Sequence, residues 1–304
     1  MFTKEKNVFN DSSGLMLPKV SDPEIFLNTL RSLEEKHKCI RSTVIGESIM
    51  GRPICAVTLG SDRMSRGVLF AGGMCGDDRY SPAVLLRFIR DYAEFLESGK
   101  RICSVSIPYL YANRCIHVIP MLNPDGYAIR KHGVADIPIR DRLIAMNGSE
   151  DFSAWKFNAR GVDLAENFTE LSDSPNRGIR AESEPETAAL CSYIRMAESG
   201  IFGKIELAME LHGRNSCIRC SSGDVTASRS RTVGRLLSRM TECETEKHSS
   251  PGGELCDYFL RDMGRCAFSC GFARSDGEIQ SAHDEVLHIY ASFREALFSA
   301  PLLI

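Results

Sequence analysis

The chain has 304 residues, of which 43% are hydrophobic and 25% charged, with a formal net charge of −3 and a pI near 6.2. This is an ordinary globular composition, and the charge balance gives no reason to expect binding to nucleic acid or anionic membranes. No apolar run approaches the roughly 20 residues of a membrane span. The polar start over residues 1–6 lacks the apolar stretch of a signal peptide, so we expect a cytoplasmic protein.

Twelve cysteines are scattered along the chain and do not form the compact framework of a small secreted protein. Without an export signal we interpret them as reduced thiols, most of them small core residues. Cys217-Ile-Arg-Cys220 has the spacing of a zinc-binding pair, but no second pair accompanies it. On a strand its two sulfurs would point to opposite faces and could not share a metal ion.

Strands and helices alternate after a polar lead-in over residues 1–20, which we separate from a domain over residues 21–304. We expect strands over residues 42–48, 53–59, 67–71, 115–120, 205–211 and 267–272, the first two joined as a hairpin. We expect a first helix that begins near Asp22. Further helices are expected over residues 81–96, 183–197, 225–240, 253–263 and 281–298. Ser183-Glu-Pro-Glu186 has the pattern of a capping box. This alternation predicts an α/β sheet covered on both faces.

Polar segments follow three of the expected strands: Cys75-Gly-Asp-Asp78, Asn123-Pro-Asp-Gly126 and His212. In α/β sheets, sites gather at the carboxyl ends of the strands. The site is therefore expected where these segments meet.

The order of motifs from about residue 45 to residue 289 resembles the zinc carboxypeptidases, closest to the bacterial members that trim peptidoglycan stem peptides. The resemblance rests on Pro120-Met-Leu-Asn-Pro-Asp-Gly126, on Trp155-Lys-Phe-Asn158 with Gly161-Val-Asp-Leu164, and on Leu211-His212-Gly213. It implies a single domain with a mixed, mostly parallel eight-stranded sheet between helices. We interpret Asn123–Gly126 and Gly161–Leu164 as scaffold rather than chemistry.

The family's chemistry needs a zinc ion held by an H-x-x-E motif and a later histidine, with a separate glutamate as general base. The resemblance places Cys75 and Asp78 at the H-x-x-E positions and His212 at the third ligand. Ala165 and Glu166 stand where the family has an asparagine and the arginine that grips a substrate carboxylate. Gly271 stands at the general base, and the nearest downstream acids are Asp276 and Glu278.

Several alternatives stay open. Cys75, Asp78 and His212 could bind zinc, or they could line a metal-free pocket. Cys75 and His212 could form a nucleophile–base pair. Glu166 could favour a cationic ligand group, or pair with a nearby arginine.

We interpret the chain as an impaired pseudo-peptidase that binds a peptide or a cell-wall fragment, without nucleic-acid or membrane partners. The alternative is an altered metallohydrolase that uses a Cys/Asp/His zinc site.

Overall fold

The computed structural model describes residues 22–60, 66–200, 203–213, 216–220, 227–247, 252–272 and 281–304. The expected lead-in over residues 1–20 lies outside these ranges. So do the first residues of the helix expected over 225–240, and both acids downstream of Gly271.

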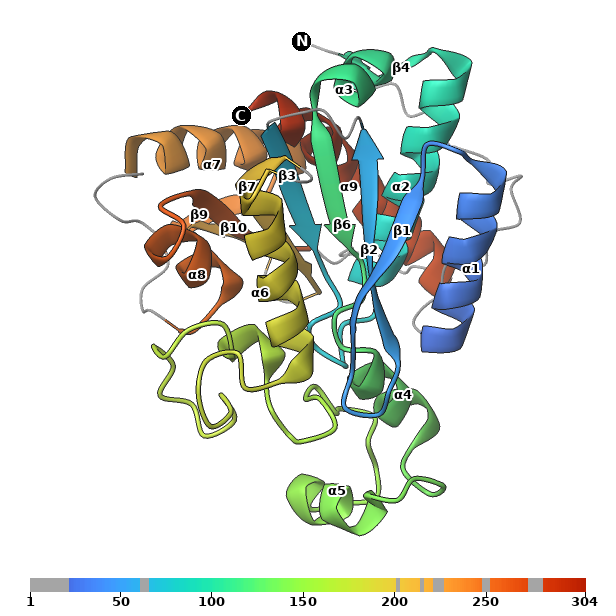
Figure 1. The fold of residues 1–304 in the computed structure, drawn as a ribbon, viewed down its shortest axis with the longest axis vertical. Helices are drawn as coiled ribbons and strands as arrows, with labels where there is room; N and C mark the ends of the chain where they lie inside the picture. The colour runs from blue at the N-terminus through green and yellow to red at the C-terminus, as the bar shows by residue number, and fades with distance from the viewer. Residues whose placement is uncertain are drawn as a thin grey trace.

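A mixed eight-stranded sheet forms the centre of the molecule, in the order β1-β2-β6-β3-β7-β10-β8-β9 (Figure 1). Four of its seven strand pairs are parallel: β6 with β3, β3 with β7, β7 with β10, and β8 with β9. The predicted fold class is therefore confirmed. The strands are β1 (Arg41–Glu47), β2 (Pro53–Gly60), β3 (Arg66–Ala71), β6 (Cys115–Ile119), β7 (Lys204–His212), β8 (Cys217–Cys220), β9 (Glu244–Lys247) and β10 (Cys266–Gly271), and a separate ribbon pairs β4 (Arg101–Ile102) with β5 (Val105–Ser106).

Helices cover both faces of this sheet. In Figure 1, α6 and α8 lie in front of it, and α2 and α9 lie behind. The helices are α1 (Pro23–Lys36), α2 (Ser81–Ser98), α3 (Ile107–Asn113), α4 (Pro124–His132), α5 (Arg140–Asn147), α6 (Pro185–Glu198), α7 (Ala227–Thr241), α8 (Leu255–Arg261) and α9 (Ala282–Ser299), with short 3-10 turns η2 (Leu164–Glu166) and η3 (Ala300–Leu302).

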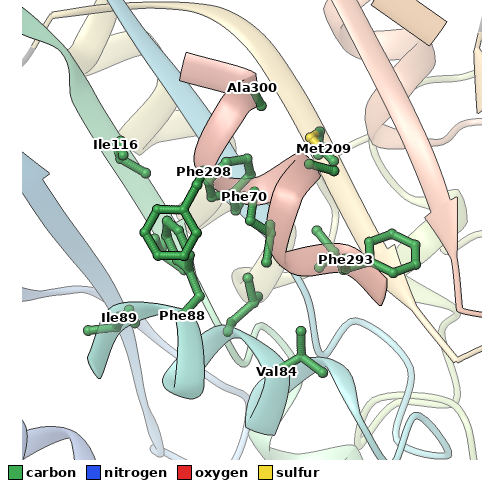
Figure 2. Packing of buried hydrophobic residues seen from close by; sticks show 14 of the residues in the cluster. Phe70, Val84, Phe88, Ile89, Ile116, Met209, Phe293, Phe298 and Ala300 are labelled. Carbon is green, nitrogen blue, oxygen red and sulfur yellow. The ribbon is translucent and has the colours of Figure 1, made fainter. Parts of the chain in front are cut away.

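The larger core cluster lies between the sheet and helices α1, α2, α7 and α9. Figure 2 shows Phe70 of β3, Phe88 of α2 and Phe298 of α9 packed together, with ring centroids of Phe70 and Phe298 at 5.4 and 4.9 Å from that of Phe88. Burial of each phenylalanine contributes about 1.5–3 kcal/mol. The apolar run of β3 is buried on both sides because a second cluster packs under α6 and α8.

Local details differ from the expectations at several elements. The expected capping box at Ser183 is wrong: the N-cap of α6 is Glu184, without a side-chain cap hydrogen bond. The Ser183 hydroxyl instead accepts from Asn167 Nδ2 (3.0 Å) and donates to Glu184 Oε1 (2.9 Å). The Asn123 turn also continues into helix α4, which Asn123 caps by accepting from the Gly126 N–H at 2.9 Å.

All twelve cysteines are free thiols, and nine of them are buried, as expected. Cys217 and Cys220 lie on β8, three residues apart, so their side chains leave opposite faces of the strand. The C-x-x-C spacing therefore does not make a metal pair.

No helix among the described residues is both long enough and apolar enough to span a membrane.

Candidate functional site

The expected site residues come together at one edge of the sheet, where the parallel strands β3, β7 and β10 end. Gly271 of β10 pairs directly with His212 of β7. A Cβ atom on the next residue, Gly213, would lie 3.3 Å from Asp78 Oδ1, so the loop after β3 reaches the end of β7. Asp78, His212 and Gly271 therefore lie close together at the carboxyl ends of these strands, and Cys75 lies on the loop that follows β3.

Asp78 is buried and directed at the start of helix α2. Its Oδ1 atom accepts hydrogen bonds from the backbone N–H groups of Tyr80 (3.0 Å) and Ser81 (3.2 Å), and its Oδ2 atom accepts from the Ser81 hydroxyl. Burial raises the pKa of this carboxyl above its ordinary value, and the three hydrogen bonds oppose the rise.

His212 is buried at the end of β7, with its imidazole beside the next strand. Its Nε2 atom lies 2.8 Å from the hydroxyl oxygen of Ser269 on β10. Ser269 lies two residues before Gly271, so its side chain leaves the same face of the strand. No motif pointed to this partner, because the contact depends on the pairing of two strands whose contacting residues lie 57 positions apart in the chain.

The thiol of Cys75 lies 3.9 Å from Asp163 Oδ1, within the weak hydrogen-bonding range of sulfur. The other oxygen of Asp163 forms an ion pair with Lys156 Nζ at 2.7 Å. Asp163 also caps η2 by accepting from the Ala165 N–H at 3.2 Å. The interpretation of residues 161–164 as scaffold is consistent with these contacts.

The structure gives no support to a zinc ion held by the three expected ligands. In the described part of the chain, no group of three or more histidine, cysteine, aspartate or glutamate side chains could hold a metal ion. Cys75, Asp78 and His212 are all described residues. The hydrogen bonds that both oxygens of Asp78 accept do not favour zinc ligation. Zinc ligation by this set and a Cys75–His212 nucleophile–base pair both stay predictions.

Glu166 lies half-buried on η2, beside the start of α8. Its Oε2 atom accepts a hydrogen bond from the Ser172 hydroxyl at 3.0 Å. Within the described ranges no arginine or lysine forms an ion pair with it. The neighbouring Ala165 is also half-buried and carries no polar side chain. The hypothesis of an arginine partner for Glu166 therefore receives no support from these contacts.

Glu210 is an ionisable residue near the carboxyl end of β7 that sequence reasoning missed. It lies on the same face of β7 as His212, it is 5% exposed, and its Oε2 atom has no hydrogen-bond partner among the described residues. Burial, reinforced by the Glu254 carboxylate, raises its pKa, and Arg219 on β8 acts in the opposite direction. A glutamate inside the apolar run that precedes His212 was the available signal.

The turn at residues 123–126 has a scaffold role, as interpreted. Asn123 Nδ2 donates to the carbonyl oxygen of Met74 at 2.9 Å and so fixes the loop that carries Cys75. Gly126 packs so closely that a Cβ atom would lie 2.5 Å from the Phe157 carbonyl oxygen. A larger residue there would displace the segment that carries Lys156.

Comparison with known proteins agrees with the motif order. The zinc carboxypeptidase family model matches residues 26–248. The "Gamma-D-glutamyl-L-diamino acid endopeptidase 1" of Lysinibacillus sphaericus is 24% identical over an alignment of 262 residues that covers 82% of this chain and 64% of that protein. The chain thus spans less than two thirds of the length of this curated relative.

Two solved structures share the fold. Thrombin activatable fibrinolysis inhibitor matches with a TM-score of 0.70 and 17% identity over 93% of this chain and 73% of that one. Murein-tripeptide amidase MpaA from Escherichia coli O157 matches with a TM-score of 0.52 and 21% identity over 84% and 91% of the two chains. Since the family model covers more than half of the sequence, the chain belongs to the zinc carboxypeptidase family.

Proposed function

We propose that this protein binds a peptide or a peptidoglycan-derived fragment and does not cleave it. The observation that carries the proposal is Gly271, which pairs directly with His212 and which the resemblance aligns with the family's general base. A positioned general base contributes about 10²–10⁴-fold to a hydrolytic rate. Glycine has no side chain with which to take a proton from water or return it to a leaving amine.

The choice of ligand class rests on the relatives. One is named for a bond between γ-D-glutamate and a diamino acid, and another for a murein tripeptide. Glu166 supports a ligand whose nearest group is cationic, since a carboxylate there repels a terminal carboxylate. The twelve free thiols are typical of a reducing compartment, which supports the expected cytoplasmic location.

The test combines binding and turnover on one peptide panel that includes muropeptide stems. We expect calorimetry to detect binding of at least one stem whose C-terminal carboxylate is amidated, and amino-acid release from unblocked stems to stay at background with or without added zinc. Gly271→Glu alone should also remain inactive, because four other family positions differ. Restoration of peptide turnover should need Gly271→Glu together with Cys75→His, Asp78→Glu, Ala165→Asn and Glu166→Arg.

Chelator-sensitive turnover by the unmodified protein would reject the proposal in favour of an altered Cys/Asp/His zinc hydrolase. Absence of binding to every stem would reject the ligand class.

A further inference from the structure

We infer that this site is built without a metal ion, and that Asp78 fixes the loop between β3 and α2 by hydrogen bonding instead. The inference goes beyond the proposed function, because a peptide could be bound with or without zinc. It concerns what holds the loop over residues 72–80 in place.

The first argument is the occupation of the Asp78 carboxylate. A carboxylate that ligates a metal must direct a lone pair of one oxygen at the ion. Here Oδ1 accepts from two backbone N–H groups and Oδ2 accepts from a hydroxyl, and all three donors belong to Tyr80 and Ser81. The carboxylate therefore caps the start of α2, whose first N–H groups would otherwise lack partners.

The second argument is that these bonds close a network. The Ser81 hydroxyl, which is fully buried, also accepts from the Gly73 N–H at 2.8 Å. The Asp78 N–H donates to the Cys75 carbonyl oxygen at 3.0 Å, and the Gly72 N–H donates to the Ile119 carbonyl oxygen at 2.9 Å. The loop is thus held at both ends and in its middle by hydrogen bonds within the protein.

The third argument concerns the surroundings of Cys75. Its thiol lies 3.9 Å from Asp163 Oδ1. Asp163 is itself paired with Lys156, whose positive charge disfavours a cation nearby. These contacts agree with the lack of a metal-holding group among the described residues.

The test is thermal unfolding in zinc and in chelator, together with zinc analysis of protein made in zinc-containing medium. We expect well under one zinc per chain and the same Tm in both solutions. Asp78→Asn should lower Tm by about 2–6 °C, equally in both, because it loses acceptor capacity for buried donors. Asp78→Glu has the family's ligand type, yet it should also lower Tm without creating a response to zinc, since its longer side chain misplaces the cap.

Ser81→Ala removes the hydrogen bond to Asp78 Oδ2, so the Tm of this variant should fall as well. It leaves the three expected metal ligands unchanged. This variant and Cys75→Ser carry the test if Asp78 variants do not fold. A stoichiometric zinc content that Cys75→Ser abolishes, together with a Tm of the unmodified protein that rises in zinc, would overturn the inference. Peptide binding is not a readout here, so failure of the proposed function would be seen separately.

Discussion

The proposal of binding without cleavage rests on two residues, Gly271 and Glu166. Gly271 keeps the backbone of β10 in register with β7 and removes a side chain from the position beside His212. Glu166 lies on η2, and the resemblance aligns it with the arginine that grips a substrate carboxylate in the family. Neither residue disturbs the fold, so the change that we propose concerns the chemistry of the site and not its scaffold.

At Glu166 we predict that charge decides affinity for ligands with a terminal carboxylate. Two like charges about 4 Å apart repel by on the order of 4 kcal/mol at an intermediate dielectric, and less at this half-exposed position. The unmodified protein should show no measurable binding of such peptides by calorimetry. Glu166→Arg should bind them at least about tenfold more tightly.

The control for this prediction is Asp173→Arg, which makes the same change of charge at an exposed position nearby. It should leave the affinity unchanged. Equal gains in both variants would mean that net charge, and not the position of Glu166, controls binding.

At the scale of elements, the hairpin tip (residues 48–52) between β1 and β2 is held by carboxylates from two helices. Asp125 of α4 accepts from the Ser48 hydroxyl (2.8 Å), the Met50 N–H (2.8 Å) and Arg52 Nη1 (2.7 Å). Glu186 of α6 accepts from the Ile49 N–H at 3.3 Å. The tip thus joins segments that are far apart in the sequence.

We predict that Asp125→Asn lowers the free energy of unfolding by about 2–3 kcal/mol, because an amide cannot accept from three donors as a buried carboxylate does. Chemical denaturation measures this change. The control is Asp151→Asn. The Asp151 carboxylate also accepts a backbone N–H, from Ser153, but it lies at an exposed position, so this variant should leave the unfolding curve nearly unchanged. A similar loss in both variants would contradict the role given to the hairpin tip.

Glu186 should make stability depend on pH. Burial raises its pKa to about 7 from 4.5, although hydrogen bonds from Ile49 and Asn158 oppose the shift. Because the folded state favours the protonated acid, its contribution to stability is fully present below pH 4.5 and is lost as the pH rises through 7. The loss is on the order of 3 kcal/mol at most.

Glu186→Gln should therefore show a smaller fall in Tm between pH 5 and pH 8 than the unmodified protein. Glu150→Gln, at an exposed position, serves as the control and should retain the full fall. An unchanged pH profile in Glu186→Gln would show that another group is responsible.

Across the whole molecule, the sequence predicts elements well where a strand or helix buries a periodic apolar face. The run at residues 67–71 and the helical stripe Phe26, Leu30 and Leu33 are buried as expected. Strand β9 was missed because Glu-Thr-Glu-Lys has no apolar alternation, and it forms only by pairing with β8 at the sheet edge. Helices α3 and α5 were also missed, since each is short and its pattern is weak.

Predictions about the site went as far as the positions of its residues and no further. The motif order placed Asp78 and His212 at the strand ends, where the structure has them. Their partners Ser81 and Ser269 could not be deduced from the motifs, because hydrogen bonding to them depends on how the loop turns and how β10 pairs with β7. Glu210 was missed because the run around it is apolar and was interpreted as a strand, although a glutamate in such a run is itself a signal.

The order of the strands also has a consequence for how the chain folds during synthesis. Strand β3 ends at Ala71, yet its neighbour β7 begins only at Lys204, and β10 follows at Cys266. A ribosome must therefore release most of the chain before the centre of the sheet can close, and such distant pairing is slow. Until then β3 can pair only with β6, and its other edge stays unpaired and open to aggregation and to chaperones.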